Sequence, residues 1–239
     1  MYGVNHMKYS NEVVLDTSLS AMTSAGFSYE KWTKGNYAPW QAPEYIYTTN
    51  IAQSVAALPF KPGVYCEYNS KDAISWANKA SFGRRLAKLT SRSRSDILVA
   101  NANDDFRYII EVKKRVWSKT KIENDVGRIA DIIGPNKAST VSSGASVFFV
   151  CYSGESQKDA RGKLDEFITA NSKNYSDVKR YDTDAWLIRG AKEYLGSRKF
   201  SVKLHVDNII RQYVAVGDDE ETDWAWTSCA LEIKPERNK

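Results

Sequence analysis

The sequence predicts an α/β protein with a mixed central sheet flanked by helices. Helical and strand-like patterns alternate through the middle of the 239-residue chain, which is typical of this class. The continuous apolar run Val147–Tyr152 indicates a buried central strand. The last forty residues instead alternate apolar and polar side chains, as half-buried strands do. With 42% hydrophobic residues, the chain can bury a sizeable core.

We expect one domain in three parts. Residues 1–42 hold a helix over Asn11–Met22 and an aromatic segment that packs on the core. Residues 43–175 form the core, and residues 176–239 form a β-rich extension of the same domain. The strands of this extension are expected over Phe200–Val206, Arg211–Val216 and Asp223–Ile233.

The core begins with a helix and a strand. Pro43 suits a first helical turn, and apolar residues follow at helical spacing up to Pro59. Val64–Tyr68 is short, rich in β-forming residues and bounded by turn residues, which predicts a strand. Residues 72–89 have a weak helical pattern that Gly83 interrupts, which predicts a helical insertion.

A hairpin and two helices complete the core. Asp96–Ala100 and Arg107–Val112 are predicted strands, and the loop between them has a turn-forming composition. An apolar stripe at helical spacing then predicts a helix that ends at Gly134. The stripe consists of Ile122, Val126, Ile129 and Ile133. Lys158–Ala170 predicts a further helix after the central strand.

Composition excludes several classes of function. No apolar stretch approaches the ~20 residues of a membrane-spanning helix, and the first residues lack the features of a signal peptide. We therefore expect a cytoplasmic protein with no membrane partner. Three scattered cysteines and two distant histidines argue against a disulfide framework, structural zinc and histidine-pair chemistry. Because the common phosphate-binding glycine motifs are also absent, carboxylate and lysine chemistry remains.

An acid opens the first strand of the predicted hairpin, and a Glu-x-Lys sequence closes the second. Strand side chains alternate between faces, so Glu111 and Lys113 should share one face while Val112 points to the other. The start of the first strand lies beside the end of the second, which would bring Asp96 to both. Two carboxylates suit Mg²⁺, which usually takes one or two of them together with waters and substrate phosphate. A lysine beside them can orient water or stabilise developing negative charge.

These residues and their order resemble the PD-(D/E)XK nuclease superfamily. Its restriction-endonuclease-like core is a helix, three strands, a helix and a further strand, with Asp on the second strand and Glu-x-Lys on the third. The resemblance covers about Pro43–Tyr152, less than half of the chain, with Ser95 where the family often has proline. It implies that Asp96 and Glu111 bind the metal and that Lys113 is catalytic, with Mg²⁺ as cofactor and Mn²⁺ as a substitute. The alternative is a solvated ion pair at a strand end, since a bare Glu-x-Lys occurs by chance in a chain of this size.

Other acids are candidates for the same site. Glu44 extends the inward stripe of the first core helix, and members of the family often carry an acid there that reaches the metal through water. The alternative for Glu44 is an interaction with the helix dipole alone. Glu67 faces either the site or solvent by strand alternation. Asp125 is expected to pair with a base or to support the site indirectly rather than to bind the metal.

Positive charge is concentrated around the predicted site. Residues 73–121 carry 12 bases and 4 acids, a local charge of +8 compared with +5 for the whole chain. Such a surplus favours binding of phosphate backbones through counterion release, and a solvated helix face is the alternative. The expected nucleic-acid contacts are Lys79, Arg84, Arg85, Lys88, Arg92, Arg94, Lys114 and Arg115.

Two tryptophans share a face of a predicted strand near the C-terminus. Trp224 and Trp226 occupy alternate positions, which is typical of packing residues or interface anchors. The alternative is a platform on which nucleic-acid bases stack.

The sequence therefore predicts a Mg²⁺-dependent nuclease that hydrolyses phosphodiester bonds. DNA is the expected polymer and endonucleolytic cleavage the expected mode, and a homodimer would suit a double-strand cutter. One alternative is a catalytically inactive nucleic-acid-binding or assembly protein on the same fold. The other is a structural protein whose basic helix binds an acidic protein surface.

Overall fold

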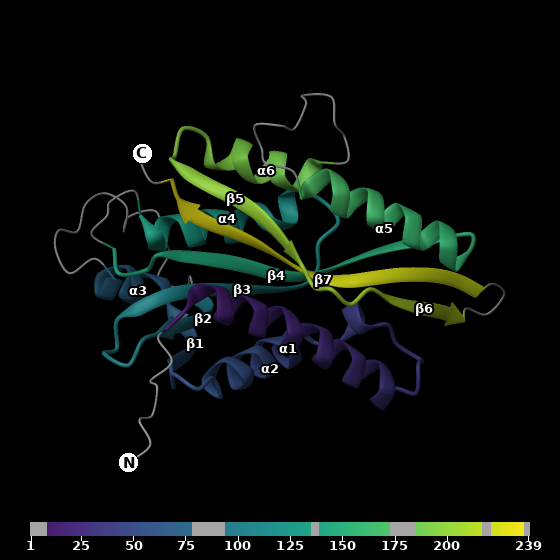
Figure 1. Ribbon diagram of the computed structural model, residues 1–239, viewed down its shortest axis with the longest axis horizontal. Coiled ribbons are helices and arrows are strands. Elements are labelled where there is room, and N and C mark those ends of the chain that lie inside the picture. Colours follow the sequence, from purple (N-terminus) through teal and green to yellow (C-terminus); the bar gives the residue numbers. More distant parts are fainter. Residues whose placement is uncertain (1–8, 78–93, 135–138, 173–184, 217–220, 237–239) are drawn as a thin grey trace, which may run out of the picture.

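The computed structural model describes residues 9–77, 94–134, 139–172, 185–216 and 221–236. In these residues six α-helices flank a seven-stranded mixed sheet, as Figure 1 shows. The predicted α/β class with a mixed sheet is confirmed. No helix of the described residues is both long and apolar enough to cross a membrane.

The helices and strands follow the predicted order with two differences. The elements are α1 (Asn11–Trp32), the 3-10 helix η1 (Pro39–Gln41), α2 (Glu44–Ala56), β1 (Gly63–Asn69), α3 (Ser70–Ala77), β2 (Arg94–Ala100), β3 (Phe106–Arg115), α4 (Thr120–Ile133), β4 (Ser143–Gly154), α5 (Gln157–Asn171), α6 (Trp186–Leu195), β5 (Phe200–Val206), β6 (Arg211–Val216) and β7 (Glu221–Pro235). The helix predicted to end at Met22 continues to Trp32, and α6 was not predicted. Most of the predicted insertion, including Gly83, lies outside the described residues.

Glycines at close contacts account for both differences. A Cβ at Gly26, inside α1, would lie 2.8 Å from the Phe149 ring on β4, so this glycine is kept for packing and does not end the helix. In α6, a Cβ at Gly190 would lie 2.6 Å from the Cβ of Lys119. Ala185 at the start of α6 also provides no side-chain cap.

One sheet runs through the whole described chain in the order β1-β2-β3-β4-β7-β5, with β6 also paired to β7. The β3–β4 pair is parallel and the other pairs are antiparallel. β7 pairs with β4 from Gly144↔Ile233 to Gly154↔Asp223. The C-terminal strands therefore extend the same sheet that contains the predicted hairpin.

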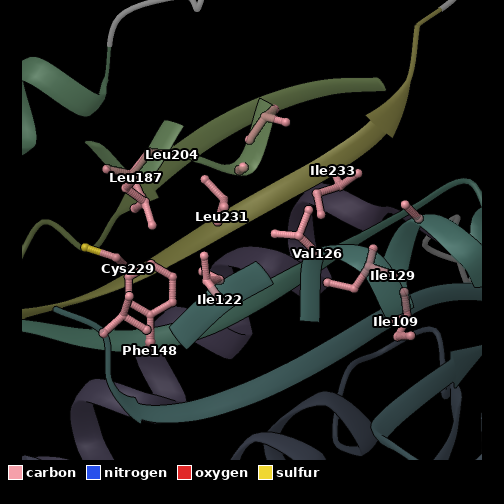
Figure 2. Close-up of a cluster of buried hydrophobic side chains, with 14 of the residues drawn as sticks. Ile109, Ile122, Val126, Ile129, Phe148, Leu187, Leu204, Cys229, Leu231 and Ile233 are labelled. Atoms are coloured by element: carbon pink, nitrogen blue, oxygen red, sulfur yellow. The ribbon is translucent and has the colours of Figure 1, made fainter. Parts of the chain in front are cut away.

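Helices cover both faces of the sheet. Figure 1 shows α1 and α2 on one face and α4, α5 and α6 on the other. Figure 2 shows Ile122, Val126 and Ile129 of α4 directed at the strands, near Phe148 and Leu231. The predicted stripe of α4 is fully buried, and burial of each such side chain contributes roughly 1.5–3 kcal/mol. This packing fixes α4 over the strand that carries Glu-x-Lys.

β3 presents different residues to the two helical layers. Ile110 and Val112 pack in the core under α1 and α2, whereas Ile109 packs in the core under α4. A Cβ at Gly144 of β4 would lie 2.2 Å from the Ile109 side chain and 2.8 Å from the Ile129 side chain, so only glycine fits there. The result is a close approach of α4 to β3, which places polar residues of α4 over Glu111.

Candidate active site

The start of β2 and the end of β3 separate at the predicted site. The last paired residues of this antiparallel pair are Ile97 and Ile110. One residue further, the Oδ2 atom of Asp96 accepts a hydrogen bond from the backbone N–H of Val112 at 2.6 Å. A side chain therefore replaces the strand partner, and the half-buried Asp96 carboxylate is held beside the Glu-x-Lys sequence.

Glu111 is the most buried acid of the site, with no exposed surface. Its Oε2 atom accepts a hydrogen bond from Nη1 of Arg128 on α4 at 2.5 Å. Nη1 of Arg128 also donates to the backbone oxygen of Arg94 at 2.8 Å, which ties α4 to the start of β2. The other oxygen, Oε1, is buried and has no hydrogen-bond partner among the residues that the structure describes. Burial, and then the negative charge of Asp96, raise the pKa of Glu111 well above its usual range.

Lys113 contacts Asp125, an acid on α4. Its Nζ lies 3.5 Å from Oδ1 of Asp125, and the other oxygen of Asp125 accepts a hydrogen bond from Ser146 on β4 at 3.2 Å. Burial alone lowers the pKa of Lys113, but Asp125, Glu44 and Asp96 together raise it above its usual value. Burial raises the pKa of Asp125 to about 6 in spite of Lys113. Asp125 pairs with a base, which agrees with the expectation for this residue.

Glu44 lies at the same end of the sheet, in the first turn of α2. Burial raises the pKa of Glu44, while the charge of Lys113 and a hydrogen bond from the backbone N–H of Lys114 lower it and Asp96 raises it. The carboxylate of Glu44 therefore interacts with the site electrostatically. Its participation through water stays a prediction.

The side chain of Glu67 is exposed to solvent, at the position that the β1–β2 register places opposite Asp96. Its φ is 52°, a left-handed conformation. Among the described residues, the charges that act on Glu111 and Lys113 come from Glu44, Asp96, Asp125 and Arg128, and not from Glu67.

The predicted basic residues divide into two groups. Lys79, Arg84, Arg85, Lys88 and Arg92 lie outside the described residues. Arg94 and Lys114 are exposed. Arg115 is partly buried, and its guanidinium lies 5.0 Å from the Trp224 ring and 5.7 Å from both the Trp40 and the Trp117 rings. Arg115 is thus enclosed by aromatic side chains next to the site.

Trp224 and Trp226 are packing residues, as expected. Trp226 is fully buried, with its ring 5.3 Å from that of Phe149 at 90°. Trp224 is partly buried, and its ring lies 5.2 Å from Trp40. Neither supplies an open platform for bases.

Two features of the site were missed from the sequence. The first is Arg128, three residues after Asp125 and so on the same side of α4, a spacing that could have identified it. The second is a cleft of about 650 Å³ beside the carboxylates, which we call the Trp117 cleft. Its walls contain four aromatic rings, four cations and, as the acid, Glu44. Glu44 and Lys113 belong both to this cleft and to the carboxylate site.

The residues present fit a hydrated divalent cation. Asp96 and Asp125 both raise the pKa of Glu111, and Asp96 also raises the pKa of Asp125, so three acids lie close enough to interact. The unpartnered Oε1 of Glu111 is a buried acceptor that a cation would satisfy. Within the described residues, no group of three or more His, Cys, Asp or Glu side chains is arranged to hold a metal by itself.

Comparisons of the chain with protein-family models, with curated proteins and with solved structures gave no match.

Proposed function

We propose that this protein is a Mg²⁺-dependent nuclease whose site consists of Asp96, Glu111 and Lys113. The observation that carries the proposal is the buried Glu111, with one unpartnered oxygen, beside Asp96 at the point where β2 and β3 separate. Buried acids with raised pKa values that face one another cost stability, and such groups cluster at functional sites. Positive side chains around the site favour a polyanionic substrate.

The order of elements also supports this proposal. α2, β1, β2, β3, α4 and β4 occur in the order helix, three strands, helix and strand, with α3 inserted between β1 and β2, Asp96 on the second strand and Glu111 on the third. This is the arrangement that the resemblance to the PD-(D/E)XK superfamily implies, so we propose a restriction-endonuclease-like core. DNA as the polymer, endonucleolytic cleavage and a cytoplasmic location stay predictions.

The chemistry divides among three side chains. Asp96 and Glu111 would hold the cation, which when bound polarises a phosphoryl oxygen and makes water more acidic. Lys113, held by Asp125 at 3.5 Å, is placed to stabilise negative charge that develops on the phosphate. The oxygen of water forms a bond to phosphorus, one P–O bond to a sugar oxygen breaks, and that oxygen takes up a proton. The products are a phosphate monoester and a free hydroxyl end.

A cleavage assay with a matched control tests the proposal. The intact protein is incubated with supercoiled DNA, linear DNA and RNA under Mg²⁺, Mn²⁺ or chelator. Glu111→Gln removes the charge at the site, and Glu232→Gln makes the same substitution at another buried glutamate of the sheet. We expect the wild type and Glu232→Gln to cleave. We expect cleavage by Glu111→Gln to be reduced on the order of 100-fold or more. Equal cleavage by both variants would refute the assignment.

One observation favours a second candidate, an inactive nucleic-acid-binding protein on the same fold. Nη1 of Arg128 already lies 2.5 Å from one oxygen of Glu111, so a cation of the chain itself occupies one of the two oxygens proposed to bind the metal. This alternative predicts salt-sensitive binding of nucleic acid that survives chelator, with no cleavage under any divalent metal.

A further inference from the structure

The Trp117 cleft differs in character from the carboxylate site that it adjoins. Its cations are Lys113, Lys114, Arg115 and Lys121. Its aromatic walls include Tyr37, Trp40 and Trp117. A volume of about 650 Å³ falls within the range of sites that hold a small organic ligand. The cleft is therefore large enough for a nucleotide and carries the charge that would attract one.

Two of the four rings of this cleft are open to solvent. Trp117 is 58% exposed and Tyr37 is 52% exposed, whereas Tyr29 and Trp40 are partly buried. Nζ of Lys121 lies 4.7 Å from the centre of the Trp117 ring, and the guanidinium of Arg115 lies 5.7 Å from it. Flat apolar surfaces next to cations suit a ligand that combines flat rings with negative charge. Nucleic acid has this composition, with a phosphate for every base.

We infer that the Trp117 cleft binds an unpaired stretch of a nucleic-acid strand, with a base stacked on Trp117 and phosphates near Lys114 and Lys121. Stacking requires the face of a base, and in a duplex both faces are covered by neighbouring base pairs. An acidic protein segment would satisfy the cations but would leave the exposed rings without flat partners. The inference rests on the proposed function, and it names single-stranded nucleic acid as the substrate class.

The Trp117 cleft is continuous with the carboxylate site. Lys113 and Glu44 line the cleft, and both interact with Asp96. A strand held in the cleft would therefore lead directly to the acids proposed to act on it. Single strands, flaps and frayed ends become the expected substrates, in preference to uninterrupted duplex.

Binding measured without metal tests the cleft separately from cleavage. Fluorescence anisotropy of a labelled 12-nucleotide oligo(dT) and of a labelled blunt duplex of equal length is followed in chelator, with the full chain. We expect the single strand to bind at least tenfold more tightly than the duplex. Trp117→Ala should weaken single-strand binding roughly 5- to 150-fold, the equivalent of the ~1–3 kcal/mol measured per stacked base, and Trp117→Phe should retain most of it. Equal affinity for duplex and single strand would overturn the inference.

Two further variants exclude general effects. Trp76→Ala removes another tryptophan of similar exposure, 51%, that lies among Asp72, Asp104 and Asp105, and it should leave binding unchanged. Lys121→Gln should reduce the slope of log affinity against log salt by about 0.7, the value for one phosphate of a single strand. Unchanged binding by Trp117→Ala, or displacement of oligo(dT) by a polyglutamate peptide at equal charge concentration, would contradict stacking. Single-strand binding by a protein that cleaves nothing would uphold the cleft and refute only the nuclease.

Discussion

Asp96 and Val112 are joined across two strands that no longer pair: the carboxylate of Asp96 accepts the backbone N–H of Val112 at 2.6 Å. The hydrogen bond has two consequences. It satisfies a donor that the sheet leaves without a partner, and it fixes an acid beside Glu111. Structure and proposed chemistry thus depend on the same atoms, and substitutions can separate them.

Substitutions of Asp96 should separate stability from cleavage. In Asp96→Asn the amide oxygen can still accept from Val112, so we expect a melting temperature near that of the wild type and no cleavage, since the charge is gone. Asp96→Ala leaves the N–H unsatisfied and should cost about 1–3 kcal/mol. For a chain of this length, each kcal/mol lowers the melting temperature by about 2–4 °C. Scanning calorimetry measures the melting temperatures of the two variants, and a plasmid-nicking assay measures their cleavage. Full cleavage by Asp96→Asn would contradict the role of its charge.

Mg²⁺ should stabilise the folded protein through Glu111. A ligand at 100 times its Kd adds about 2.7 kcal/mol to the free energy of unfolding, so the melting temperature should rise by several degrees at saturating Mg²⁺. Glu111→Gln should show little of this rise, and Glu232→Gln should show all of it. NaCl of the same ionic strength is the control for screening. A similar rise in Glu111→Gln would place the cation elsewhere.

Arg128 should matter for stability more than its position on a helix surface suggests. Arg128→Ala leaves the buried carboxyl of Glu111 and the backbone oxygen of Arg94 without their donor. Removing one partner of a buried ion pair costs on the order of 3 kcal/mol, which denaturant unfolding can measure. Arg128→Lys should recover part of the loss. Arg161→Ala, which breaks an exposed pair with Asp165, should change stability by less than about 1 kcal/mol. Equal effects of the two alanine variants would contradict this account.

Glu232 should make stability depend on pH. Burial alone would raise its pKa, but a hydrogen bond with His205 at 3.0 Å and an ion pair with Lys234 at 2.9 Å hold the pKa of this carboxyl below its usual 4.5. The charged form is thus favoured in the folded state, so its contribution is fully present above pH 4.5 and is lost as pH falls through the lowered pKa. The free-energy difference between wild type and Glu232→Gln should therefore shrink below pH 4.5 in urea unfolding. A free-energy difference that grows on acidification would have the opposite sign and would refute the lowered pKa of Glu232.

Local periodicity was sufficient to predict the hairpin and the residues that it brings together. Alternation along β3 places Glu111 and Lys113 on one face, and antiparallel pairing places Asp96 beside them. The position of Arg128 over Glu111 depends on how α4 crosses β3, which includes the close contact at Gly144. No local sequence pattern carries that information.

The Trp117 cleft could not be predicted for the same reason. It joins α1, the segment around Trp40 and the end of β3, which are far apart in the sequence. α6 carries an internal glycine, Gly190, which reduces the helical signal of its sequence. Contacts between distant segments, rather than local preferences, determine these features.

The most direct test of the central claim is the single-turnover rate of cleavage as a function of Mg²⁺ concentration. The account predicts a rate that saturates with Mg²⁺ in the wild type and in Glu232→Gln, and that falls by at least about 100-fold in Glu111→Gln. A rate in Glu111→Gln equal to that of the wild type, or cleavage that persists in chelator, would contradict it.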